Sequence, residues 1–99
     1  MVNVNYKKDN IIKEVKISGH ARYDTFGKDI VCAAVSSIVT TTINNILTLD
    51  DKAITYVDED GYILITNKDS EIADKLLNTM LNMLSELSND YPKNIKIGG

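Results

Sequence analysis

The feature that most constrains this sequence is a continuous apolar segment of about twenty residues that begins at Ile30 and contains interspersed serine and threonine. Many of its residues are β-branched, so propensity alone would permit a strand. The length favours a helix, because strands of small domains are much shorter. The segment therefore predicts one largely buried helix, with Asp29 as its N-cap and Asp50 and Asp51 beyond its end.

Apolar and polar residues alternate on both sides of this predicted helix, which indicates strands. Residues 2–6 and 12–17 flank a polar turn and predict an antiparallel hairpin. A second hairpin is predicted over residues 54–65, with its turn at residues 58–61. A final short strand is expected around residues 95–97.

A second helix is predicted from Ser70 and Glu71, and it is amphipathic. Its apolar positions recur at helical spacing: Ile72, Leu76, Leu77, Met80, Leu81, Met83, Leu84 and Leu87. Met80 and Met83 share this stripe and are interpreted as core residues or part of a dimer interface. The order ββαββαβ predicts an α+β fold, with two helices packed on one face of a mostly antiparallel sheet.

Length and composition limit the class of protein. The 99 residues, of which 43% are hydrophobic and 25% charged, predict a single globular domain over residues 1–99. A net charge of -3 argues against direct nucleic-acid binding. The start of the chain lacks a secretory signal pattern, and we expect no membrane-spanning run and a cytoplasmic location. The single cysteine fits a reducing compartment.

Cys32 and His20 are the candidate catalytic residues. Cys32 follows the predicted cap Asp29 by three residues, where unpaired N–H groups and the helix dipole favour a thiolate and could form an oxyanion hole. His20 lies where the second strand ends and a loop over residues 19–28 begins, so it could reach the helix start. The alternatives are a buried structural cysteine and an exposed loop histidine.

For the other polar residues near this segment, the sequence gives weaker evidence of a functional role. Asp29 could orient His20, although the helix-capping role already explains an aspartate there. Ser36 lies one turn after Cys32 and could bind substrate, or it could bond a carbonyl of its own helix. The acidic residues 58–60 lack metal-ligand spacing and are interpreted as a solvated turn, so we expect no metal and no cofactor.

The segment from Gly19-His20-Ala21 through Gly27 to Asp29-Ile30-Val31-Cys32-Ala33-Ala34 and Ser36 resembles the bacterial family of ribosomal-processing cysteine proteases. The matching motif covers about eighteen residues, and the rest of the chain agrees in length and order of elements. The resemblance implies an α+β homodimer without metal. It also implies that Cys32 attacks a peptide carbonyl and His20 transfers the proton.

The implied substrate is the N-terminal extension of large-subunit ribosomal protein twenty-seven, removed after an aromatic pair. The family's mobile loop corresponds to residues 19–28 here, with Gly19 and Gly27 as hinges that could contact substrate. Two other readings remain open. One is a noncatalytic ribosome-assembly or protein-interaction module, and the other is a redox-sensing thiol, which the absence of a resolving cysteine disfavours.

Overall fold

The computed structural model describes residues 1–19 and 30–99 in full and the backbone of residues 26–29. Five strands and two helices follow one another in the predicted order ββαββαβ. Their bounds are β1 Val2–Asp9, β2 Ile11–Ser18, α1 Phe26–Leu49, β3 Ile54–Glu59, β4 Tyr62–Asn67, α2 Glu71–Asp90 and β5 Ile95–Gly98.

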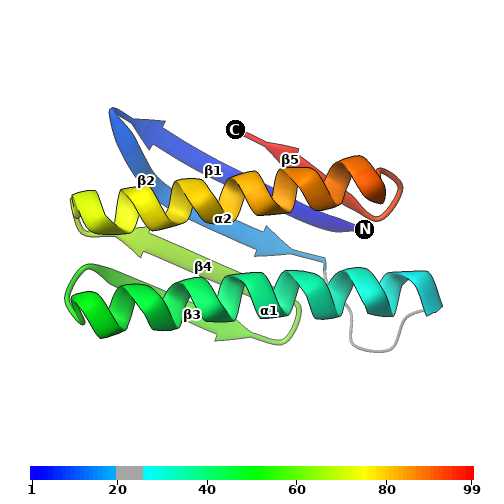
Figure 1. Cartoon of the computed structure of the whole chain (residues 1–99), viewed down its shortest axis with the longest axis horizontal. Helices are drawn as coiled ribbons and strands as arrows, with labels where there is room; N and C mark the ends of the chain where they lie inside the picture. Colours follow the sequence, from blue (N-terminus) through cyan, green and yellow to red (C-terminus); the bar gives the residue numbers. More distant parts are fainter. Residues whose placement is uncertain (20–25) are drawn as a thin grey trace.

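The strands form one sheet in the order β3-β4-β2-β1-β5. All neighbours are antiparallel except β1 and β5, which are parallel, with Val2 opposite Ile95. Both helices lie on the same face of this sheet, α1 toward the β3 side and α2 toward the β5 side (Figure 1). The predicted α+β fold, with a mostly antiparallel sheet covered on one face, is confirmed.

The two hairpins turn at residues in the left-handed conformation. Asn10, with a φ of 65°, joins β1 to β2, and Gly61, with a φ of 76°, joins β3 to β4. The second turn is shorter than the predicted turn at residues 58–61, because Asp58 and Glu59 belong to β3 and Glu59 pairs with Tyr62. Glycine at the left-handed position allows the strands to reverse over fewer residues than the acidic run suggests.

The second helix begins where its capping signal predicts. The Ser70 hydroxyl accepts a hydrogen bond from the Ala73 N–H at 3.1 Å, as an N-cap residue does. The buried side of α2 consists of Ala73, Leu77, Met80, Leu81 and Leu84. Met80 is therefore a core residue, whereas Met83 is 46% exposed and lies outside the core.

Helix α1 ends at Leu49, before Asp50 and Asp51, as predicted, but it begins at Phe26. Asp29 is therefore inside the first turn, and the prediction that it caps the helix is wrong. An acidic residue is favourable in the first helical turn as well as at the cap, because its charge interacts with the positive end of the dipole. An aspartate alone therefore cannot specify the first residue of a helix.

The segment Ile30–Leu49 of α1 is long and apolar enough to cross a membrane, by length and composition only. The expectation that no such run exists is therefore wrong. One side of the segment is part of the core on the sheet, with Val31, Val35, Val39 and Ile46 at 1% exposure or less. A helix that packs in a protein core can be as apolar as a membrane-spanning helix when its outer side carries no charge.

A buried amide connects the sheet to the start of α2. Asn67, at the end of β4, is 5% exposed, and its Nδ2 donates to the carbonyls of Ile12 at 2.9 Å and Ser70 at 3.1 Å. Its Oδ1 accepts from the Ser70 N–H at 2.8 Å. Every polar atom of this amide thus has a partner, which makes its burial favourable.

Candidate active site

The candidate site lies at one end of the molecule, where β2 ends. The Gly19 N–H donates to the Gly61 carbonyl at 3.1 Å, so the end of β2 is held against the turn between β3 and β4. The first residue of the chain is close by, since a Cβ on Gly19 would lie 2.4 Å from the Met1 carbonyl oxygen. Helix α1 begins at this same end, on the right of Figure 1.

Gly19 is the described residue next to the candidate base. Its φ of 82° is in the left-handed region, and the Met1 carbonyl leaves no room for a side chain. Both features require glycine. The structure thus gives Gly19 a conformational role, while its predicted part in substrate binding stays a prediction. His20 lies outside the described residues, and so does its predicted contact with Cys32.

Cys32 is a free, half-buried thiol on α1, and its side chain packs against the edge of the hydrophobic core. It lies six residues after Phe26, in the second turn of the helix and not in the first. The unpaired N–H groups of a helix belong to its first turn, here residues 26–29. The position of Cys32 in the second turn therefore does not support the prediction that unpaired N–H groups beside it form an oxyanion hole.

Cys32 is on the side of α1 that is turned away from α2. Ile38 and Asn45 of α1 line a groove against α2. Each helical residue rotates by 100°, so Cys32 lies roughly 120° around the helix from Ile38. Ser36, one turn further on, is exposed on the same side as Cys32. The strand of the sheet on the α1 side is the edge strand β3 (Figure 1).

The other predicted residues lie in the first turn of α1. Gly27 is the second residue of the helix, so the prediction that it is a hinge at the end of a loop is wrong. Asp29 is two residues further along the same turn, and whether its carboxylate orients His20 stays a prediction. The acidic residues 58–60 are exposed at the β3–β4 hairpin. Within the described part of the chain, no group of three or more His, Cys, Asp or Glu residues could hold a metal ion.

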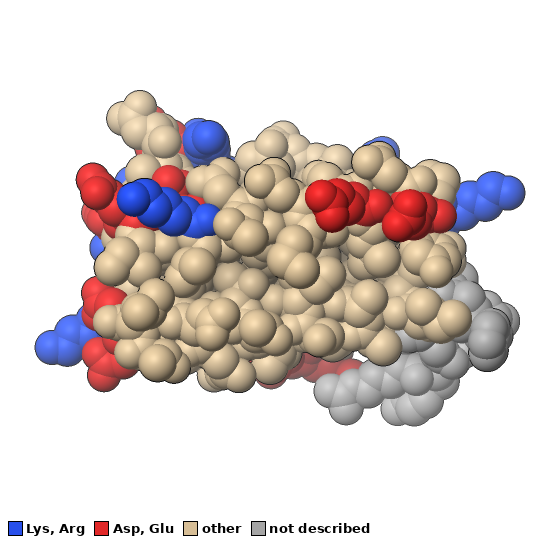
Figure 2. Space-filling model, in the orientation of Figure 1, with Lys and Arg blue, Asp and Glu red and all other residues tan. Residues whose placement is uncertain are grey.

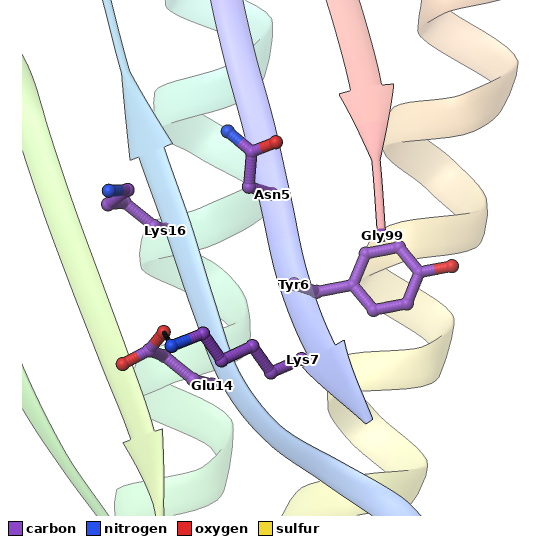
Figure 3. A pocket seen from close by; sticks show the side chains of 6 residues that line it. All are labelled: Asn5, Tyr6, Lys7, Glu14, Lys16 and Gly99. Carbon is purple, nitrogen blue, oxygen red and sulfur yellow. Dashed lines mark ion pairs between the residues drawn. The ribbon is translucent and has the colours of Figure 1, made fainter. Parts of the chain in front are cut away.

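A cavity of about 310 Å³ lies elsewhere, beside β1, β2 and the last residue of the chain (Figure 3). Lys7 and Glu14, which both line it, form an ion pair with 3.6 Å between Nζ and Oε2, and Tyr6 lies against Gly99. The residues that line this cavity include neither a thiol nor an imidazole. It therefore lacks the groups that nucleophilic peptide cleavage requires.

Comparison with known proteins adds to this geometry. The family model described as cysteine protease Prp matches residues 1–96. The ribosomal processing cysteine proteases Prp from two strains of Staphylococcus aureus are each 31% identical over 100 residues, covering 97% of this chain and 94% of theirs.

Solved structures show the same similarity. The essential ribosomal processing protease Prp from S. aureus with a substrate peptide has a TM-score of 0.91 at 26% identity, covering all of both chains. The same protease with a covalently linked product peptide has a TM-score of 0.88 at 28% identity, covering 99% of this chain and 98% of that one. A Streptococcus mutans protein has a TM-score of 0.83 at 27% identity, covering 99% of this chain and 92% of that one.

Proposed function

The chain belongs to the cysteine protease Prp family, and from this premise we propose that Cys32 is the nucleophile and His20 the general base of a ribosomal-processing endopeptidase. One observation carries the assignment of both residues. A cysteine protease needs a thiol, and this chain contains one cysteine and one histidine. The chain therefore offers no other thiol for the covalent step and no other imidazole to take its proton.

The proposed reaction has two balanced steps. The Cys32 sulfur forms a bond to the scissile carbonyl carbon while His20 takes the thiol proton, and the collapse of the tetrahedral intermediate breaks the C–N bond. His20 gives its proton to the leaving amine. Water, deprotonated by His20, then attacks the thioester and releases the carboxylate product and the free thiol. All groups that act in these steps belong to the chain, the peptide or water.

Three features of the described residues support this proposal. The Cys32 thiol is half-buried, on a side of α1 that α2 does not cover. The exposed Ser36 hydroxyl follows it by one turn and could hydrogen-bond the peptide backbone. Gly19 is held by its N–H bond to Gly61 and by its close approach to Met1, so the chain leaves β2 toward His20 from a defined position.

For the substrate, we propose the N-terminal extension of large-subunit ribosomal protein twenty-seven, cut after an aromatic pair. The S. aureus relatives are named as ribosomal processing proteases, and a crystal structure of Prp from S. aureus contains a substrate peptide. We further propose that this protein acts in the cytoplasm as a homodimer. It would bind its precursor as a protein partner without contacting nucleic acid, in keeping with its net charge of -3.

The test is cleavage of a peptide that spans the aromatic pair, followed by mass spectrometry. Wild type and Thr55→Ala, which changes an exposed residue of β3, should release both fragments, whereas Cys32→Ala and His20→Ala should lose most of the activity. Cleavage by Cys32→Ala would refute the assigned nucleophile. If wild type binds the peptide without cutting it, the noncatalytic interaction module would replace this proposal.

A further inference from the structure

Strand β3 forms one edge of the sheet, and its outer side has no neighbouring strand within the described residues. Its inner side pairs with β4, and the Lys68 N–H donates to the Ala53 carbonyl at 2.8 Å directly before the strand. Backbone groups of an antiparallel pair point alternately to the partner strand and away from it. Counting from Ala53, the odd-numbered residues of β3 direct their N–H and C=O groups to β4. Tyr56 and Asp58 therefore direct theirs outward, and we call these outward groups the open edge.

The open edge lacks the features that usually protect the edge of a sheet. Every residue of β3 after Ile54 is exposed. Between Ile54 and Asp58 the strand contains no charge and no proline, and its register with β4 is regular. Tyr56 is 47% exposed and Val57 is 42% exposed. An uncharged, regular edge of this kind pairs readily with another extended chain.

Tyr56 and Val57 present apolar side chains on opposite faces of the sheet, because successive side chains of a strand alternate. Tyr56 pairs with the buried Ile65, so it lies on the face that the helices cover. Val57 pairs with Leu64 on the open face. A strand added to the open edge would therefore meet one apolar side chain on each face, in register with its own alternating side chains.

The open edge leads toward the candidate nucleophile. Helix α1 and β3 run in opposite directions, and β3 ends toward the end of the molecule where α1 begins (Figure 1). From Leu49 back to Cys32, α1 extends roughly 26 Å, whereas β3 extends roughly 17 Å from Ile54 to Glu59. Cys32 therefore lies roughly 9 Å beyond the end of β3 along the molecule, a distance that about three residues of extended chain can span.

The charges at this edge suit a basic chain. Asp58 and Glu59 are exposed at the end of β3, and a ribosomal protein that binds RNA phosphates is basic. Figure 2 shows charged side chains along the borders of the helical face and none over its centre, so electrostatic attraction acts at the borders. A second copy of this chain carries the same net charge of -3, which disfavours it as a partner for these carboxylates.

We propose that the N-terminal extension of the precursor binds as an added strand on the open edge, parallel to β3, with its scissile bond at Cys32. The direction follows from the substrate, because the extension lies before the cleaved bond and the body of the ribosomal protein lies after it. Tyr56 and Val57 then contact residues about five or six positions before that bond. The inference rests on the proposed function and adds that the substrate is recognised through its backbone at β3.

The test is fluorescence anisotropy with labelled peptides and the Cys32→Ala variant, which cannot cut them. The complete extension should bind on the order of 10-fold more tightly than a peptide shortened to two residues before the aromatic pair, because the short peptide cannot reach Tyr56. N-methylation at successive upstream positions should weaken binding only at every second residue, because alternate N–H groups of the added strand face β3. Tyr56→Pro removes an outward N–H without breaking the pairing with β4, and it should weaken binding of the complete extension only.

Tyr56→Ser and Ile72→Ser form a matched pair, because the two side chains are 47% and 46% exposed and Ile72 lies on α2. Tyr56→Ser should weaken binding of the complete extension several-fold, and Ile72→Ser should not. Circular dichroism should show that all variants are folded. Equal affinities of the long and short peptides, or equal losses at successive N-methyl positions, would overturn the added strand. A dimer of the free chain that Tyr56→Pro dissociates would also overturn it, in favour of a second copy at this edge.

Cleavage by the wild-type chain, measured in parallel, separates this inference from the proposed function. Binding with the alternating N-methyl pattern but without cleavage refutes only the protease role. Cleavage of the long and short peptides with equal kcat/KM, without the alternating pattern, refutes only the added strand. A chain that neither binds nor cuts the complete extension refutes both.

Discussion

Replacing Gly19 by alanine should weaken both folding and catalysis. An alanine held at a φ of 82° costs about 1 kcal/mol more than glycine, because its Cβ approaches the following carbonyl. The new methyl would also lie 2.4 Å from the Met1 carbonyl oxygen, so one of the two must move by roughly 1 Å to reach ordinary contact. Met1 is half-exposed, but Val2 is buried and its N–H is bonded to the Asn94 carbonyl, which resists the shift.

The dihedral and the contact together should lower the free energy of unfolding by about 2–3 kcal/mol. In a domain of this size, that loss lowers Tm by roughly 10 °C. The fold should survive, because small domains are stable by about 5–15 kcal/mol. Residue 19 directly precedes the proposed base His20, and a displacement of about 1 Å at a catalytic group lowers kcat/KM on the order of 100-fold.

The assays are urea denaturation followed by circular dichroism, and kcat/KM for the aromatic-pair peptide at a temperature where each variant is folded. Gly19→Asn is the informative control, because asparagine adopts the left-handed conformation readily but still has a Cβ. Gly19→Asn should lose less stability than Gly19→Ala, because only the contact with the Met1 carbonyl destabilises it. The reasoning is refuted if Gly19→Ala matches wild type in both its urea midpoint and its kcat/KM.

Two further predictions concern the structure around the start of α2. Asn67→Ala removes a buried amide with three hydrogen bonds and should lower the free energy of unfolding by about 2–3 kcal/mol, whereas the exposed Asn89→Ala should change it by less than about 0.5 kcal/mol; equal urea midpoints would contradict this. The hydrogen bond between Lys13 and Asp69 raises the pKa of Lys13 and lowers the pKa of Asp69. The stability that Asp69 contributes should be lost as the pH falls below 3.8, because the carboxylate is then protonated. The stability that Lys13 contributes should be lost as the pH rises above 10.5, because the ammonium group then loses its proton. Wild type should therefore have a higher Tm than Lys13→Met only between these two pH values. A Tm difference that does not change with pH would exclude this ion pair as its source.

Local patterns in the sequence were sufficient to predict most of the elements. Alternation marks both hairpins, and the capping serine and apolar stripe mark α2, because these signals depend on residues only a few positions apart. The parallel pairing of β5 with β1 joins the two ends of the chain, and no local signal encodes such a contact. The start of α1 was misplaced because aspartate is favourable at several positions of a helix N-terminus.

The candidate site was predictable as residue types and spacing. The single cysteine and the single histidine are visible in the sequence, but the position of Cys32 in the second helical turn depends on where α1 begins. The need for glycine at position 19 arises from the Met1 carbonyl, a contact made only after the sheet has formed. The uncharged run from residue 30 to 49 was visible as well, yet only the packing shows that its outer side is left uncovered.

The most direct test of the central claim is covalent capture of the nucleophile. A peptide that ends in the aromatic pair and carries an electrophilic ketone should add once to the wild-type chain. Intact-mass and tandem mass spectrometry should locate the adduct on Cys32, and His20→Ala should slow its formation strongly while Thr55→Ala, at an exposed position of β3, should not. An adduct on any other residue, or equal rates for wild type and His20→Ala, would contradict the assignment of Cys32 and His20 as nucleophile and base.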